Sequence, residues 1–252
     1  LIYSLLHLAG YDLSLADLRD FRQWGSRTPG HPEYGHTAGV ETTTGPLGQG
    51  VANAVGMAIA ERTHRETFGS DLCDHYTWAI AGDGCLMEGV ASEAASLAGH
   101  LGLGRLNVLY DSNAITIDGG TDLAFGEDVA ARFEAYGWHV NHCDGHDDAD
   151  VARALTEARQ VTDKPTLIVC TTTIGWGCAL AGSEKTHGSP LGPDEVAATK
   201  GRIGLDPKAK FQVLDGATDH MQAHDGASQR AAWQARLEAH PRKAEFKSWL
   251  DR

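Results

Sequence analysis

The chain has 252 residues, of which 42% are hydrophobic and 22% are charged, and its formal net charge is −13. This length allows one large domain or two small ones. The negative charge disfavours nucleic-acid binding, which needs a basic face, and no apolar run approaches the length of a membrane span. We therefore expect a cytoplasmic globular protein that binds neither nucleic acid nor membranes.

The cysteines predict neither a zinc site nor a disulfide framework, because no two of them form a C-x-x-C pair. Reduced thiols are the ordinary state of such residues in a cytosolic protein. The five positions are Cys73, Cys85, Cys143, Cys170 and Cys178.

The first part of the chain predicts helices on either side of one long loop. Residues 1–9 have a helical pattern, and a second short helix opens at Asp12 or Ser14 and reaches about Trp24. Residues 25–47 are rich in Gly, Pro, Thr and His and show no period; a loop of this length in a domain is usually functional or disordered. The density of His and Thr favours a functional loop. A long helix, 51–66, follows.

A strand-to-helix junction at Gly82-Asp83-Gly84 is the first feature that predicts a site. Residues 76–81 are apolar and β-prone, and residues 86–102 carry apolar side chains at helical spacing. Glycine lets the backbone turn sharply and approach a ligand, and a helix N-terminus favours anions. From these residues alone, a tight turn without a ligand is an equally good interpretation.

A second strand brings an amide side chain to the same edge. Residues 105–111 form this strand, and Asn113 follows it. Asp83 and Asn113 then offer two oxygen ligands at neighbouring strand ends, beside a helix end that accepts phosphate. Such a set suits a Mg²⁺ ion that bridges a diphosphate.

The later part of the chain alternates between helices and strands. This order predicts an α/β fold, a parallel sheet with helices on both faces, with ligands at the carboxyl ends of the strands. The expected elements are a helix at 127–136, a strand at 138–142, a helix at 149–162, a strand at 166–171 and helices at 193–200, 228–239 and 242–252.

Taken together, these motifs resemble a known family. The Gly-Asp-Gly motif with Asn113 about thirty residues later resembles the thiamine-diphosphate signature. The stretches 28–33, 41–50 and 133–138 are similar to transketolase, and the likeness covers roughly residues 1–205. The resemblance implies the diphosphate-binding (PP) domain of the thiamine-diphosphate-binding fold.

The resemblance also implies a role for individual residues. The metal, Mg²⁺ with Ca²⁺ or Mn²⁺ as alternatives, would be held by Asp83, Asn113 and the backbone carbonyl of Ile115. The cofactor thiamine diphosphate would contact Gly45, Pro46, Leu47, Gly84, Asn113 and His187. His31 and His187 would act in catalysis on the sugar substrate. From the residues alone, each of these histidines also fits a solvated loop position. Ala114 stands where the family commonly has Gly or Lys.

The implied reaction is the transfer of a two-carbon ketol unit from a ketose phosphate to an aldose phosphate, a step of the pentose phosphate pathway. The resemblance further implies a homodimer associated through the cofactor interface. A pyrimidine-binding domain, from the rest of the protein or from a second chain, would complete the site. Dihydroxyacetone synthase, deoxyxylulose-phosphate synthase and an inactive remnant remain as alternatives. The histidine loops favour transketolase over deoxyxylulose-phosphate synthase.

The chain starts at Leu1 inside a helical pattern, without a cap, which predicts a fragment or an incomplete gene product. We expect residues 1–205 to form the PP domain without its beginning. Residues 206–252 would form a helical linker towards the absent pyrimidine-binding domain. The isolated chain is therefore predicted to lack ketol-transfer activity.

Overall fold

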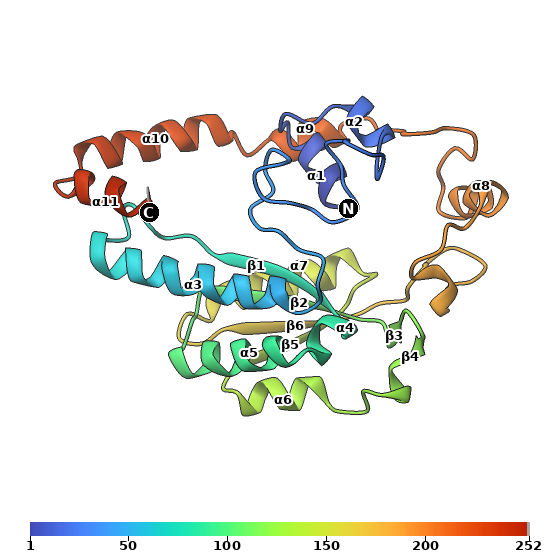
Figure 1. Cartoon of the computed structure of the whole chain (residues 1–252), viewed down its shortest axis with the longest axis horizontal. Coiled ribbons are helices and arrows are strands. Elements are labelled where there is room, and N and C mark those ends of the chain that lie inside the picture. Colours follow the sequence, from blue (N-terminus) through green and yellow to red (C-terminus); the bar gives the residue numbers. More distant parts are fainter. Residues whose placement is uncertain (251–252) are drawn as a thin grey trace. The chain divides into compact units, whose positions relative to one another are not determined.

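A computed structural model describes residues 1–250 of the chain. Its central element is a four-stranded parallel sheet in the order β1-β2-β6-β5 (Figure 1). The strands are β1 (Thr77–Gly82), β2 (Leu106–Ser112), β5 (His139–Asp144) and β6 (Thr166–Thr171). All four match predicted strands to within two residues, and the expected parallel α/β fold is confirmed.

Helices cover both faces of this sheet, as predicted. Successive side chains of a strand point to opposite faces, so Leu167 and Ile168 of β6 belong to two different apolar clusters. On the Ile168 face, α7 packs through Ala154 and Ala158, which are fully buried. On the Leu167 face, α5 packs through alanines, which allow the helix to lie close to the sheet. The helices of the two faces are α3 (Gln49–Phe68), α5 (Gly89–Leu101) and α6 (Val129–Ala135) on the Leu167 face, and α7 (Asp148–Gln160) on the other.

The predicted helix 86–102 is two helices in the structure. α4 (Asp83–Met87) and α5 meet at Glu88, whose backbone is extended with φ −72° and ψ 137°. One extended residue followed by Gly89 does not interrupt the apolar spacing, so the sequence pattern runs through the break. The first of these helices, α4, begins directly at Asp83, three residues before the predicted start.

Contacts divide the chain into two compact units. The second unit, Pro46–Ile59 and Tyr76–Lys210, contains the sheet. It also holds α8 (Pro193–Arg202), the small hairpin β3 (Ile115–Thr116) and β4 (Gly119–Gly120), and the short helices η1 (Thr121–Leu123) and η2 (Glu184–Thr186). The hairpin and the short helices were not predicted.

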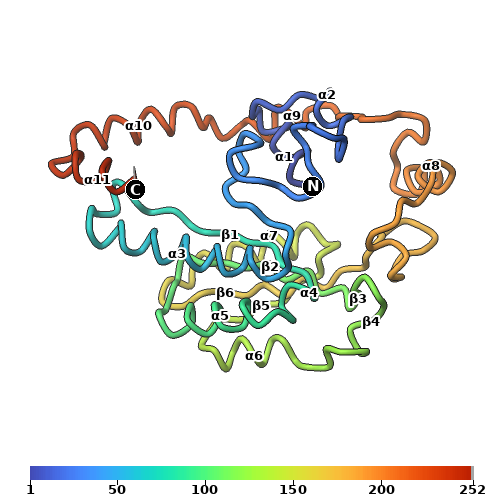
Figure 2. The backbone as a smooth tube through the Cα atoms, in the orientation of Figure 1, coloured from blue at the N-terminus to red at the C-terminus, as the bar shows by residue number. Residues whose placement is uncertain are grey.

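The first unit contains Leu1–Gly45, Ala60–His75 and the described residues from Phe211 onward. Its aromatic core surrounds Phe68, whose ring meets that of Phe246 edge-on at 5.1 Å. Figure 2 traces the chain through its elements: α1 (Ile2–Leu8), α2 (Leu15–Arg19), α9 (Ala217–Gln222), α10 (Gly226–Ala239) and α11 (Lys243–Leu250). This grouping follows contacts, whereas the division at residue 205 rests on the family resemblance and stays a prediction.

The ends of two helices in the first unit differ in detail from the predicted ends. Ser14, not Asp12, caps α2, in a capping box with Asp17. The helix ends five residues before Trp24, and Arg22 beyond it has a left-handed backbone with φ 62°. The predicted helix 242–252 is present as α11, with its last two positions outside the described residues.

Two further features concern the chain as a whole. No helix within residues 1–250 combines the length and apolar character needed to cross a membrane. All five cysteines are free thiols, although the sulfurs of Cys143 and Cys170, on paired positions of β5 and β6, lie 3.5 Å apart. Burial raises the pKa of the Cys170 thiol to about 12, so this thiol stays protonated at neutral pH.

Candidate functional site

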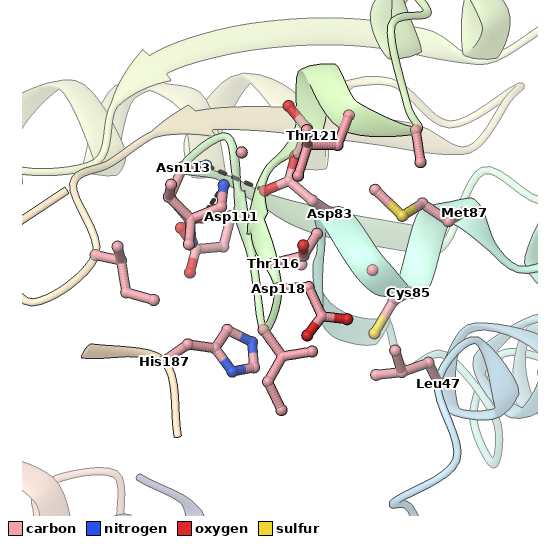
Figure 3. Close-up of a pocket in the computed structure, with 18 of the residues that line it drawn as sticks. Leu47, Asp83, Cys85, Met87, Asp111, Asn113, Thr116, Asp118, Thr121 and His187 are labelled. Carbon is pink, nitrogen blue, oxygen red and sulfur yellow. Dashed lines mark hydrogen bonds between the residues drawn. The ribbon is translucent and has the colours of Figure 1, made fainter. Parts of the chain in front are cut away.

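A pocket of about 660 Å³ opens at the carboxyl ends of β1 and β2 (Figure 3). All the residues that line it belong to the second unit. Apolar side chains form much of its wall, and polar groups from the two strand ends project into it. The lining includes Leu47, Gly82, Asp83, Gly84, Cys85, Met87, Glu88, Asp111, Asn113, Ile115, Thr116, Ile117, Asp118, Gly120, Thr121, Leu123, Ala124, Ile174 and His187.

Asp83 is the most constrained polar group of this pocket. Its side chain is only 4% exposed, although it is the first residue of α4. The Tyr110 hydroxyl donates a hydrogen bond of 2.6 Å to its Oδ1, and the backbone N–H of Asn113 lies 3.4 Å from its Oδ2. Burial and the bond to Asp83 raise the pKa of Tyr110, so the phenol remains a neutral donor. A carboxylate accepts about four hydrogen bonds, and these two contacts leave Asp83 with acceptor capacity.

Asn113 lies beside Asp83 because β1 and β2 are parallel neighbours in register. Gly82 pairs with Asp111, so the residues just beyond each strand reach the same edge. The amide oxygen of Asn113 accepts a hydrogen bond of 3.0 Å from the N–H of Ile115. Ala114 between them has a left-handed backbone, with φ 60°. The structure thus brings Asp83, Asn113 and Ile115 to one wall of the pocket, and their role as metal ligands stays a prediction.

Leu47 forms a second wall, on the turn that enters α3. It is 52% exposed, and a Cβ on Gly84 would lie 3.1 Å from its Cδ1. Gly48 beside it has φ +79°, and a Cβ there would lie 2.7 Å from the Cβ of Glu88. Both glycines therefore allow this turn to sit close to α4 and the start of α5. Pro46 is not among the lining residues that the structure describes.

His187 and Ile174 form the third wall. Both come from the long loop after β6, and Figure 3 shows the imidazole of His187 directed towards the pocket. His187 therefore lies in a loop, as expected from the sequence, and this loop forms part of the pocket wall. Its contact with a cofactor or substrate stays a prediction.

His31 and Gly45 belong to the first unit and lie against each other there. A Cβ on Gly45 would approach Nδ1 of His31 to 2.6 Å, so only glycine fits beside this ring. The loop is closed by a hydrogen bond of 3.1 Å from the Thr44 N–H to the Pro32 carbonyl. Contact of His31 and Gly45 with the cofactor or substrate stays a prediction.

Several residues in the pocket wall or directly behind it were not predicted. Tyr110 is the most informative, because its hydroxyl orients Asp83 from within a buried strand. The sequence signal that could have found it was the tyrosine itself in a predicted buried strand, since a buried tyrosine hydroxyl usually has a hydrogen-bond partner. Cys85 and Met87 reach the pocket because α4 starts at Asp83. Asp111 is held by the Thr172 hydroxyl, which donates a hydrogen bond to it.

The donors at this edge fit a hard cation with a diphosphate. One buried carboxylate, one side-chain amide oxygen and nearby backbone carbonyls are the oxygen ligands that Mg²⁺ accepts, and Mg²⁺ commonly keeps water and phosphate oxygens as its other ligands. Among residues 1–250 no cluster of three or more His, Cys, Asp or Glu side chains could hold a metal alone. The predicted set contains only one such side chain, Asp83. A Mg²⁺ ion held by this set would need oxygens of the diphosphate to complete its coordination.

Comparison of the sequence with known protein families gives a match that covers residues 1–250. The matching family is described as "Transketolase, thiamine diphosphate binding domain". The chain belongs to the transketolase family. It is 54% identical to the transketolase of Geobacillus stearothermophilus over 97% of this chain, and 53% identical to transketolase 1 of Escherichia coli (strain K12) over 95%. It spans 38% and 37% of the length of these two transketolases.

Solved transketolases have the same fold. The structure matches transketolase from Campylobacter jejuni with a TM-score of 0.94 and 46% identity, covering 98% of this chain and 39% of that one. Transketolase from Leishmania mexicana matches with a TM-score of 0.92 and 48% identity, covering 98% of this chain and 38% of that one. These matches confirm the predicted family and fold class.

Proposed function

We propose that this chain binds thiamine diphosphate together with Mg²⁺ in the pocket of Figure 3, and that it supplies the diphosphate- and metal-binding part of a ketol transfer of the transketolase type. One observation carries the proposal. The buried carboxylate of Asp83, oriented by Tyr110, lies on the same wall as the Asn113 side chain at the neighbouring strand end. Membership of a thiamine diphosphate binding family supports it.

Each wall of the pocket has a separate task in this proposal. Asp83, Asn113 and the backbone carbonyl of Ile115 hold the cation, with Ca²⁺ and Mn²⁺ as alternatives to Mg²⁺. Gly84 leaves room for the diphosphate, since any side chain there would approach Leu47. Leu47 is the apolar support under the cofactor rings, and its half-exposed side chain is free to make that contact. His187 faces the diphosphate and the substrate.

When bound, thiamine diphosphate supplies a nucleophilic thiazolium carbon that the side chains of a protein lack. The residues of this chain fix its diphosphate end and help to exclude water from the pocket. Gly45 and Pro46 would contact the pyrimidine end, and His31 would move protons at the sugar substrate.

The activity of the whole protein is part of the proposal, because the chain spans less than two fifths of the length of its relatives. A pyrimidine-binding domain, from the remaining protein or from a second chain, would close the pocket from outside. The complete enzyme would be a cytoplasmic homodimer that acts on sugar phosphates of the pentose phosphate pathway.

Calorimetric titration of the pure chain tests cofactor binding. Thiamine diphosphate should bind when Mg²⁺ is present and lose its affinity when a chelator removes the ion. Thiamine, which lacks the diphosphate, is the matched ligand control and should not bind measurably at the same concentration. Equal binding with and without Mg²⁺ would reject the metal-bridged site.

A coupled assay of sugar-phosphate turnover tests the second part. The pure chain should be inactive, because the pyrimidine end of the cofactor is not enclosed. Addition of the rest of a relative, expressed as a separate chain, should restore turnover. Turnover by the pure chain alone would contradict the division of labour proposed here.

A further inference from the structure

The loop that carries His187 is attached to α8 by two charged side chains. One carboxylate oxygen of Glu195 accepts hydrogen bonds from the Ala179 N–H at 2.7 Å and from Nη1 of Arg202 at 2.8 Å. The same Nη1 of Arg202 donates to the carbonyl of Gly177 at 2.8 Å. A residue at each end of α8 thus holds the backbone of the loop at two nearby points.

The loop lies close to α8 where these bonds form. Gly177 has φ +84°, and a Cβ there would lie 2.7 Å from Cγ2 of Ile203, so a side chain would push the loop away. Cys178 is 8% exposed, and the Thr199 hydroxyl donates a further hydrogen bond of 3.2 Å to Glu195. The loop and α8 are therefore held together by close packing and by the hydrogen bonds of Glu195 and Arg202, here called the anchor.

Internal hydrogen bonds connect the anchor to the pocket wall. The Gly182 N–H donates to the carbonyl of Ile174 at 2.8 Å, which closes the first part of the loop on itself. The Thr186 N–H and hydroxyl both donate to the carbonyl of Ser183. Thr186 also packs where Gly175 lacks a side chain, since a Cβ there would lie 2.7 Å from Cγ2 of Thr186. Residues 174–187, here called the His187 loop, are therefore joined to one another by contacts within the loop.

We propose that Glu195 and Arg202 are positioning residues that fix the His187 loop on α8, and thereby hold Ile174 and His187 on the pocket wall. Neither side chain lines the pocket, so they act through the loop and not on the ligand. This inference rests on the proposed function, because it assigns the loop to the affinity for the cofactor. It predicts that the acid and the arginine tune binding from a distance.

The arginine hydrogen bond and then the Ala179 N–H lower the pKa of Glu195 to about 2. The carboxylate is therefore charged throughout the neutral range, so its hydrogen bond with Arg202 is a charge-assisted one. A neutral substitute removes the attraction for Arg202 without changing the length of the side chain. For this reason Glu195→Gln and Glu195→Ala form a graded pair of variants.

Hydrogen exchange measured on the full chain tests the anchor itself. Glu195→Ala should speed exchange of the amides in residues 175–187, by roughly tenfold or more, because local opening becomes easier. Glu195→Gln should have a smaller effect, since its amide oxygen still accepts from the Ala179 N–H. The matched control is Glu245→Ala, which removes an Arg–Glu pair of the same 2.8 Å length in the first unit and should leave this loop unchanged.

The affinity for thiamine diphosphate with Mg²⁺ tests the consequence for the pocket. If the loop is in place only about a tenth of the time in Glu195→Ala, the dissociation constant should rise about tenfold. The imidazole NMR signals of His187 should broaden in this variant and sharpen again when the ligand is added. Glu245→Ala should bind like the unaltered chain.

The outcomes separate this inference from the proposed function. Unaltered exchange of the loop, or unaltered affinity despite faster exchange, would overturn the positioning role. Absence of binding by the unaltered chain would reject the proposed function instead, and the exchange comparison would still decide whether α8 anchors the loop.

Discussion

Two hollows at the carboxyl edge of the sheet, both lined by described residues, differ in how far their polar groups are already paired within the protein. The first is the pocket at the ends of β1 and β2. The second, of about 530 Å³, lies at the ends of β5 and β6. It is lined by His142, Cys143, Asp144, His146, Asp150, Thr171, Thr172 and Thr173. Both hollows contain acids at strand ends, so position on the sheet does not distinguish them.

In the second hollow, Asp150 and His146 already have partners within the protein. Asp150 forms an ion pair with Arg153 at 2.6 Å and accepts the Asp144 N–H at 2.8 Å. Nε2 of His146 accepts the Thr173 N–H at 2.9 Å, and its ring stacks on Trp176. A ligand would have to displace these contacts.

In the first hollow, Asp83 accepts two hydrogen bonds and has no ion-pair partner among residues 1–250, and apolar side chains such as Leu47 and Ile117 line the same pocket. An unpaired, buried carboxylate is costly unless something positive approaches it. The comparison teaches that a strand-end acid indicates a metal site when its charge is left uncompensated and its walls are apolar.

The largest effect is expected for Asp83→Ala. Removal of the only carboxylate of the predicted ligand set should weaken Mg²⁺-dependent binding of thiamine diphosphate more than about 100-fold, beyond the usual effect of an outer-shell change. Calorimetric titration measures it. The matched variant Asp150→Ala, in the second hollow, should bind normally; equal losses in both variants would remove the distinction between the hollows.

Tyr110→Phe should have the next largest effect. The ring stays in place while Asp83 loses the donor that orients it, so the affinity for Mg²⁺ should fall about tenfold. Titration with Mg²⁺ at saturating thiamine diphosphate measures this loss. The control is Tyr136→Phe, which removes a tyrosine hydroxyl from outside the pocket. A change in thermal stability without any change in the affinity for Mg²⁺ would show that the hydroxyl serves folding alone.

Leu47→Ala tests the apolar wall. Its side chain is half-exposed in the chain itself, so the free energy of unfolding should change little. Loss of contact with the cofactor rings should cost about 1 kcal/mol of binding, roughly a fivefold change in affinity. Binding that is indifferent to this truncation would mean that the rings do not rest on Leu47.

Acid titration of Asp150, in the second hollow, should give the smallest effect. The Asp144 N–H, followed by Arg153, lowers the pKa of Asp150 below its ordinary value of 3.8. A depressed pKa in the folded state stabilises the protein above the ordinary value, and this contribution is lost as the pH falls towards the folded-state pKa. The difference in unfolding free energy between the unaltered chain and Asp150→Asn should be constant from about pH 5 to 7 and shrink below pH 3.8. A difference that grows on acidification would contradict this sign.

The position of the first hollow could be predicted from the sequence because its markers are local. Gly82-Asp83-Gly84 lies at the end of one apolar strand and Asn113 follows the next, and parallel neighbours in register bring both ends to one edge. The β3–β4 hairpin was missed because its two connecting residues, Ile117 and Asp118, are not the Asn-Gly or Asp-Gly pair that signals a tight turn. The strands are only two residues long, below the length at which alternation is visible.

Other parts could not be predicted because they depend on tertiary contacts. The bond from Tyr110 to Asp83 joins residues 27 positions apart, and nothing in the strand pattern selects that partner. The anchor of Glu195 on Ala179 is equally non-local, since its helical neighbours alone make it a solvated acid of an amphipathic helix. The contact partners of a polar side chain are fixed by packing, which a single sequence does not display.

The left-handed backbone of Ala114 has a consequence for how an ion would be captured. A residue with a Cβ adopts this conformation at a cost of about 1 kcal/mol, so the folded protein must hold it there. The Asn113 amide and the Ile115 backbone on either side are therefore pre-organised before any ion arrives. The conformational entropy of this short segment is lost when the protein folds, and association with the metal then requires little further ordering of the chain.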